Sequence, residues 1–295
     1  MSFREKIKSA LKEKREKLTD SSLKTYVSIL SNLHKQMNAT DDDLDWFNKQ
    51  EREIFEHLKA QTRKSVLSAL FILTGNDEYR KIMLDDCKVV NENYKSQKMS
   101  DKEKENWIEV KEIQDIHDNL LAKVKAMFSK NMMSDYQTII DYFLIACLGG
   151  VSGILPRRSL DYALLKIRNY DTSNTSRDNY YKAGKFYFNT YKTSSKYGLQ
   201  ILDVPKELNT MIKKWIKLND TDYLLFSSNK KPLSSPQISR MLNKIFGGKH
   251  ISTDMLRHIY LTAYYKDIPK LKEMEKLSQD MGHSLNQQML YAKKE

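Results

Sequence analysis

KFYFNTYKTSSKYGLQILDVP, residues 185–205, is the stretch that decides the fold class of this chain. It begins with an aromatic and β-branched run, continues through a segment rich in Ser, Lys and Gly, and ends in a second extended run at Pro205. These residue types favour two strands joined by a turn, so the stretch predicts a β-hairpin with Lys192 and Lys196 at its tip.

Helical patterns surround this hairpin on both sides. Upstream, an apolar helix is expected over 138–148, before Gly149 and Gly150. Pro156 then suits the first turn of another helix, and Arg157 and Arg158 follow it directly, near the start of that helix. Downstream, helices are expected over 206–218, 235–246, 253–265, 269–282 and 285–295. This part of the chain is therefore predicted to be an α+β domain with a small antiparallel sheet.

The first hundred residues contain few residues that interrupt helices. The first glycine is Gly75 and the first proline is Pro156, which predicts an almost entirely helical segment. Apolar residues at helical spacing support this: Leu23, Tyr26, Ile29, Leu30 and Leu33. The run 91–104 is polar and without periodicity, as interdomain linkers are. We therefore expect an all-α domain over 1–104 and the α+β domain over 105–295.

The charge balance indicates a polyanionic partner. The 295 residues include 50 Lys and Arg against 38 Asp and Glu, a formal charge of +12 with a pI near 9.3. Residues 1–100 carry 19 basic and 16 acidic side chains, so residues 101–295 carry 31 and 22, and most of the excess. Nucleic acid is the leading candidate, and a lysine-rich solvated surface is the alternative.

Other classes of site find little support in the sequence. Cys87 and Cys147 lie in apolar helical contexts, and the six histidines are not spaced as metal ligands, so we expect no disulfide framework, no metal and no cofactor. The longest apolar run is short and interrupted by Asp141, and the N-terminus lacks a secretory pattern. We expect a soluble intracellular protein of the cytoplasm, or of the nucleus or viral factory of a host cell, that is neither membrane-bound nor secreted.

The order of polar residues in the second half carries a further signal. An arginine at a helix start precedes a hairpin lysine, then DMLRH at 254–258, MGHS at 281–284 and a tyrosine near the C-terminus. This order over residues 107–295 resembles the catalytic domain of the tyrosine recombinases, also called integrases. The resemblance implies a site-specific recombinase that cuts and rejoins DNA through a 3′-phosphotyrosine intermediate without metal or ATP. It also implies that the first domain clamps DNA.

The resemblance implies a role for each matching residue. Two arginines would hold the non-bridging phosphate oxygens, a lysine would protonate the departing 5′ oxygen, and a tyrosine would attack the phosphorus. The expected catalytic residues are Arg158, Lys192, Asp254, Arg257, His283 and Tyr291. The expected DNA-binding residues are Arg157, Lys196 and His258.

The sequence departs from the family pattern in two places and leaves one choice open. Asp254 stands where the family has the histidine of a His-x-x-Arg motif, and Asp254 is a candidate general base. His283 and Tyr291 are eight residues apart rather than the commoner nine. Arg158 is preferred as the first catalytic arginine because an acidic residue follows three positions later, and Arg157 remains the alternative.

The resemblance also implies partners and leaves rival functions open. The expected partner is double-stranded DNA, bound by a homo-tetramer on two sites, with a monomer or dimer when free. The rivals are a type IB topoisomerase, a non-catalytic DNA-binding or structural protein of the same fold, and an unrelated basic helical binder. The last predicts that Arg158, Arg257 and Tyr291 lie far apart. A Lys-, Asn- and Tyr-rich composition suggests an AT-rich genome, such as that of a virus or mobile element.

Overall fold

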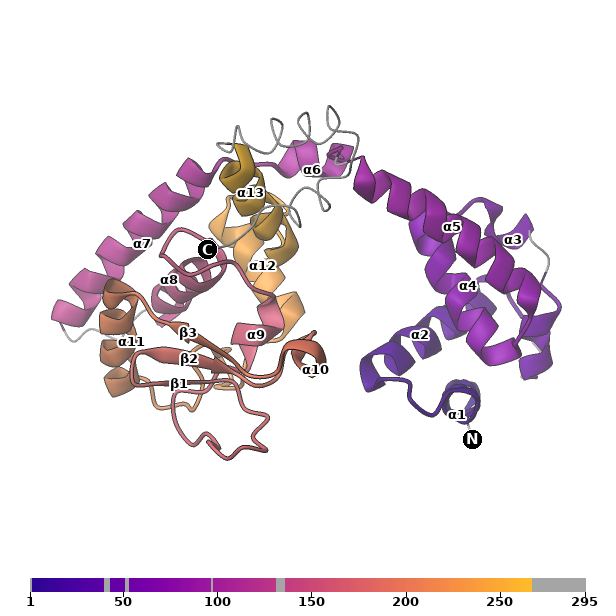
Figure 1. Ribbon diagram of the computed structural model, residues 1–295, viewed down its shortest axis with the longest axis horizontal. Helices are drawn as coiled ribbons and strands as arrows, with labels where there is room; N and C mark the ends of the chain where they lie inside the picture. The colour runs from indigo at the N-terminus through magenta and orange to yellow at the C-terminus, as the bar shows by residue number, and fades with distance from the viewer. Residues whose placement is uncertain (1, 40–42, 51–52, 97, 131–135, 267–295) are drawn as a thin grey trace, which may run out of the picture. The chain divides into compact units, whose positions relative to one another are not determined.

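The computed structural model describes residues 2–39, 43–50, 53–96, 98–130 and 136–266. The chain divides into two compact units between Met99 and Ser100 (Figure 1). Most of the described residues are helical, and the strands form one small antiparallel sheet. The predicted fold class, mainly α with a small antiparallel sheet, is confirmed.

The first unit is entirely helical within the described residues. Its elements are α1 (Phe3–Lys14), α2 (Asp20–Gln36), the 3-10 helix η1 (Leu44–Asn48), α3 (Glu53–Glu56), α4 (Ala60–Thr74) and α5 (Asp77–Lys95). α4 packs against α1, α2, η1 and α5 and is the central helix of the unit. Its apolar side chains Leu67 and Leu70 are fully buried, and Gly75 ends the helix in the left-handed conformation.

A buried ion pair fastens α5 to α4. The guanidinium of Arg63 donates to both carboxylate oxygens of Asp86, at 2.9 and 2.6 Å. Asp86 is almost fully buried, and a two-bond pair of this kind compensates for the removal of its charge from water. The first unit therefore has a defined tertiary structure of its own.

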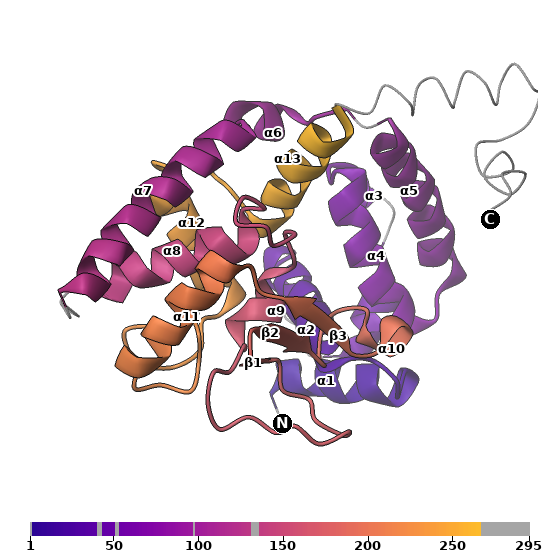
Figure 2. The same cartoon turned by 60° about the vertical axis from the view of Figure 1, so that its left-hand side comes forward.

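The second unit places helices around the sheet (Figure 2). Its helices are α6 (Asp101–Asn106), α7 (Val110–Ser129), α8 (Tyr136–Leu148), α9 (Ser159–Ala163), α10 (Ser194–Tyr197), α11 (Lys206–Leu218), α12 (Ser235–Ile245) and α13 (Thr253–Lys266). Every residue of α8 from Tyr142 to Leu148 is buried, so α8 is the core helix, with α7, α12 and α13 packed against it.

The sheet has the strand order β1 (Tyr180–Lys182), β2 (Lys185–Phe188), β3 (Gln200–Asp203), and both pairings are antiparallel. Successive side chains of β2 point to opposite faces of the sheet, which places Phe186 and Phe188 in the core. The predicted hairpin is confirmed as β2 and β3, and its connection contains the short helix α10 (Figure 1). The adjoining strand β1 was not predicted.

Two further findings concern the predicted elements. The polar run 91–104 is helical at both ends, because α5 continues to Lys95 and α6 begins after Ser100. Ser100 and Glu103 form a reciprocal capping box that accounts for α6. The helices expected over 206–218, 235–246 and 253–265 are present as α11, α12 and α13. Those expected over 269–282 and 285–295 lie outside the described residues.

Candidate active site

The two adjacent arginines at the start of α9 have different surroundings. Arg158 is the N-cap residue, and its carbonyl accepts the N–H of Asp161. Its side chain is half-buried, and no hydrogen bond or ion pair joins its guanidinium to any part of the chain that the structure describes. As far as the described residues go, Arg158 therefore keeps all of its guanidinium donors available for an anion.

The guanidinium of Arg157 is instead engaged within the protein. Its Nε donates to Asp161 Oδ2 at 2.8 Å, and one terminal nitrogen donates to Gln200 Oε1 at 2.7 Å. Its central carbon lies 4.3 Å from the ring centroid of Phe188 and 5.2 Å from that of Tyr191. These contacts engage the guanidinium both through its N–H donors and through two aromatic rings.

The Asp161 carboxylate is affected by these two arginines and by Arg257 of α13. Its carboxylate is buried, and burial raises its pKa, whereas the positive charges of Arg157, Arg158 and Arg257 act in the opposite direction. Oδ2 pairs with Arg157, and Oδ1 has no hydrogen-bond partner within the described ranges. The charges of Arg158 and Arg257, the two arginines predicted to hold phosphate, thus act on one carboxylate although they come from different helices.

The first turns of α13 carry the next group of predicted residues. Arg257 donates to Asp254 Oδ1 at 2.9 Å, and its side chain is 28% exposed. Arg257 therefore has an anionic partner one turn earlier on the same helix. Asp254 is largely exposed. It lies in the first turn of α13, where its negative charge stabilises the helix through the helix dipole. His258 lies 3.8 Å from Asp254 through Nε2 and 3.3 Å from Glu103 through Nδ1.

Gly150 allows the segment that leads to Arg158 to come close to α13. Gly150 has a φ of +77°, and a Cβ placed there would lie 2.5 Å from the Tyr260 ring and 2.9 Å from Pro156. Pro156 is two residues before Arg158, and Tyr260 is three residues after Arg257. The close approach of the two segments therefore requires glycine at position 150.

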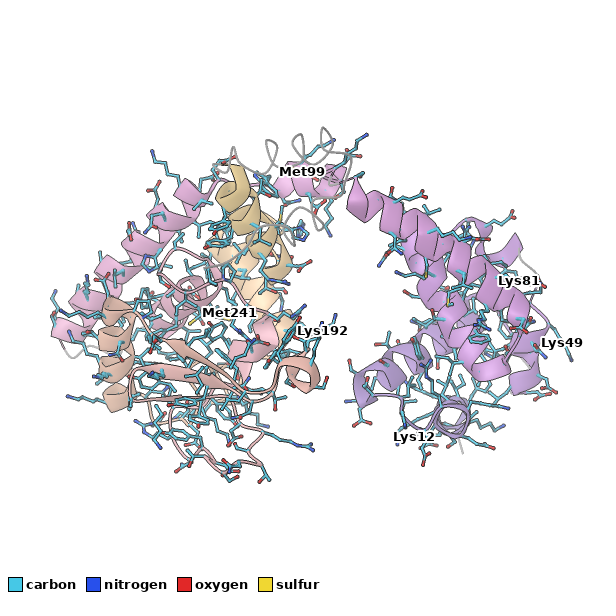
Figure 3. All side chains as sticks on the ribbon, viewed as in Figure 1. Lys12, Lys49, Lys81, Met99, Lys192 and Met241 are labelled. Carbon is cyan, nitrogen blue, oxygen red and sulfur yellow. The ribbon has the colours of Figure 1, made fainter. Side chains whose placement is uncertain are left out.

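The predicted hairpin lysines lie in the connection between β2 and β3. Lys192 is exposed in the turn that precedes α10 (Figure 3), and it directly follows Tyr191, whose ring contacts Arg157. Lys196 is exposed in α10, with its Nζ 5.1 Å from the Tyr197 ring. The remaining predicted residues, His283 and Tyr291, lie outside the described residues.

The first unit has a basic groove that the sequence reasoning missed. The groove lies between α1 and α2 and measures about 420 Å³. Its basic lining residues are Arg4, Lys8, Lys12 and Lys24, and its acidic lining residues are Glu5 and Asp20. Arg4, Lys8 and Lys12 recur every four residues, so the signal was present as a one-sided stripe on α1 (Figure 3 labels Lys12).

Other features in the described part of the chain contribute no site. A hollow of about 250 Å³ is lined by Tyr136, Phe226 and Lys230 among others, and it contains none of the predicted site residues. No group of three His, Cys, Asp or Glu side chains suited to a metal ion occurs among residues 2–266 outside the undescribed gaps. None of the described helices is long and apolar enough to cross a membrane.

Comparisons with known proteins give a limited result. No protein-family model matches the chain, and none of the curated proteins matches it. One solved structure, the crystal structure of XerA recombinase, aligns with 98% of this chain and 94% of that chain. The TM-score is 0.34 and the sequence identity 15%. A likeness of this degree does not place the chain in a family.

Proposed function

We propose that this protein binds double-stranded DNA and breaks and rejoins it through a covalent phosphotyrosine link. The observation that carries the proposal is the arrangement around Asp161. The charges of Arg158 and Arg257, from α9 and α13, act on this one buried carboxylate, and the Arg158 guanidinium forms no hydrogen bond or ion pair within the described structure. Two guanidinium groups whose charges act on one place, one of them with no donor engaged in the described structure, suit the non-bridging oxygens of a phosphodiester.

The proposed reaction assigns one step to each residue. The Tyr291 oxygen attacks the phosphorus, a Tyr–O–P bond forms, and the bond from phosphorus to the 5′ oxygen breaks. Arg158 and Arg257, with His283, donate hydrogen bonds to the non-bridging oxygens as negative charge develops on them. Lys192 gives its proton to the departing 5′ oxygen. Rejoining reverses these steps, so the energy of the broken bond is retained in the ester.

Asp254 has two candidate roles in this scheme. As a general base it would take the proton of Tyr291, and as the ion-pair partner of Arg257 it orients that guanidinium. Asp254→Asn removes the base but keeps an oxygen that can accept from Arg257. Cleavage slowed by at least about 100-fold supports the base, because general base catalysis contributes roughly that much or more. An unchanged cleavage rate removes that role.

The basic groove of the first unit is proposed to contact the DNA backbone. Arg4, Lys8 and Lys12 place like charges four residues apart, which destabilises a helix unless an anion compensates. Substituting all three by Gln is expected to reduce the slope of log affinity against log salt concentration by up to about 0.9 for each DNA phosphate that is no longer neutralised. Lys81→Gln with Lys88→Gln is the matched control, because both lysines pair with acidic neighbours on α5. An unchanged slope in the triple variant contradicts this assignment.

Trapping a covalent adduct tests the proposal as a whole. The full-length protein is incubated with a pool of nicked duplexes of random sequence. A cut near the nick releases a short fragment, which prevents rejoining and leaves the protein covalently attached to the DNA. An adduct that survives denaturing detergent is expected, and Tyr291→Phe abolishes it because the nucleophilic oxygen is removed. Tyr197→Phe, which alters an exposed tyrosine of the hairpin connection, retains it. Adduct formation by Tyr291→Phe refutes the assignment.

A further inference from the structure

Arg157 lies at the base of the connection that carries the hairpin lysines. Phe188 is the last residue of β2, Gln200 is the first residue of β3, and the two are register partners. The Arg157 guanidinium contacts both of them, through the ring of Phe188 and the side-chain oxygen of Gln200. It therefore spans the last strand pair before the chain leaves the sheet toward Lys192.

The same guanidinium holds this strand pair to α9. Asp161, which accepts from Arg157, belongs to α9, and its side chain is only 4% exposed. The third hairpin contact is the ring of Tyr191, whose hydroxyl donates to the carbonyl of Gly198 across the connection at 2.7 Å. The Arg157 side chain thus ties residues 191–198 to α9.

A second anchor acts on the same connection by a different route. The buried amide nitrogen of Asn179 donates to the carbonyls of Asp161 and Thr190, at 3.0 and 2.8 Å. Its amide oxygen accepts the backbone N–H of Thr190 at 2.9 Å. Asn179 fixes the point where the chain leaves β2, whereas Arg157 reaches both sides of the connection.

We propose that Arg157 is a positioning residue that holds the β2–β3 connection against α9 and thereby places Lys192 beside Arg158. This inference rests on the proposed function for the role of Lys192, and it replaces the expected contact of Arg157 with DNA. Only arginine has the chemistry required, because one lysine ammonium cannot reach a carboxylate, an amide oxygen and two ring faces together.

Hydrogen exchange tests the anchor without any catalytic assay. Backbone N–H groups at Ser194, Lys196, Tyr197 and Gly198 are hydrogen-bonded within the connection, so their exchange reports its stability. Arg157→Lys is expected to raise exchange over 189–199 by about tenfold or more, and Gln200→Met by a smaller factor. Arg168→Lys is the matched control, because Arg168 donates only to carbonyls at the end of α11 and just beyond it.

A change of leaving group tests whether the anchor acts through Lys192. In a duplex whose bridging 5′ oxygen is replaced by sulfur, the departing thiolate needs no proton, because thiols are far stronger acids than alcohols. Arg157→Lys is expected to slow cleavage of the oxygen substrate by about 10- to 100-fold and to leave the sulfur substrate near the wild-type rate. Lys192→Ala shows the same selectivity to a larger degree, and Arg168→Lys shows none.

The outcomes separate this inference from the proposed function. Unchanged exchange over 189–199 in both Arg157→Lys and Gln200→Met overturns the anchor. Equal slowing of the oxygen and sulfur substrates by Arg157→Lys overturns its action through Lys192. If the wild-type protein cleaves neither substrate, the proposed function fails, and the exchange comparison still decides whether Arg157 holds the connection.

Discussion

The adjacent arginines should affect stability very differently when each is replaced by alanine. Arg157→Ala leaves the buried Asp161 carboxylate without its ion-pair partner, a loss of about 3–5 kcal/mol in the free energy of unfolding. The second unit comprises residues 100–295, a size at which 1 kcal/mol shifts the melting temperature by roughly 2–4 °C. A decrease of about 8–16 °C follows for a loss near 4 kcal/mol. Arg158→Ala removes no intramolecular bond of the described structure, so about 0.5 kcal/mol or less is expected.

Scanning calorimetry of the full-length protein, combined with the adduct assay, measures both effects. Arg158→Ala should melt like the wild type yet form adduct at least about 100-fold more slowly, because a donor to the developing charge is removed. The sign of the pH effect adds a check. Burial raises the folded-state pKa of Asp161 above 3.8 and Arg157 lowers it, so loss of Arg157 raises that pKa further. The stability deficit of Arg157→Ala therefore narrows as the pH falls through these raised values toward 3.8. A stable, inactive Arg157→Ala beside an unstable, active Arg158→Ala refutes the assignment.

Three further predictions concern the second unit and the cysteines. Trp215→Phe should cost about 3 kcal/mol in urea unfolding, because a fully buried indole that donates to a backbone carbonyl is removed; a change below about 1 kcal/mol contradicts this. Thiol titration of the native protein should label Cys87 and spare Cys147, whose pKa burial raises, until denaturant is added. Hydrogen bonds from Ser100 lower the pKa of Glu103, so Glu103 stabilises the fold above about pH 4.5 and loses this effect as acid protonates it. In Glu103→Gln, the free energy of unfolding should therefore fall less steeply as the pH is lowered below about 4.5. A variant curve that runs parallel to that of the wild type contradicts this role of Glu103.

Much of the architecture could be predicted from local patterns. The hairpin at 185–205 and the helices after it follow from residue type, strand period and capping, which act over a few residues. β1 could not be recognised, because three residues after a polar stretch have too little pattern of their own and extend only by pairing with β2. The helix α6 was missed for a similar reason, since its capping box lies within charged residues.

The site shows the same division between local and tertiary information. The order of residues singled out Arg157, Arg158 and Arg257 as candidates, yet Arg157 and Arg158 have the same chemistry and adjoining positions at a helix start. Only their contacts distinguish them, since one guanidinium is enclosed by Asp161, Gln200 and two rings and the other is not. The ion pair of Arg257 with Asp254 also depends on side-chain placement that spacing alone leaves open.

The glycine at position 150 has a consequence for how this protein can vary. The segments that carry Arg158 and Arg257 approach each other over a position where no methyl group fits. Any larger residue there would clash both with the Tyr260 ring on α13 and with Pro156 beside the arginines. Under the proposed function, adaptation to new DNA sequences is therefore expected to proceed through exposed positions of the connection and of α1, while the spacing of the arginine pair stays constant.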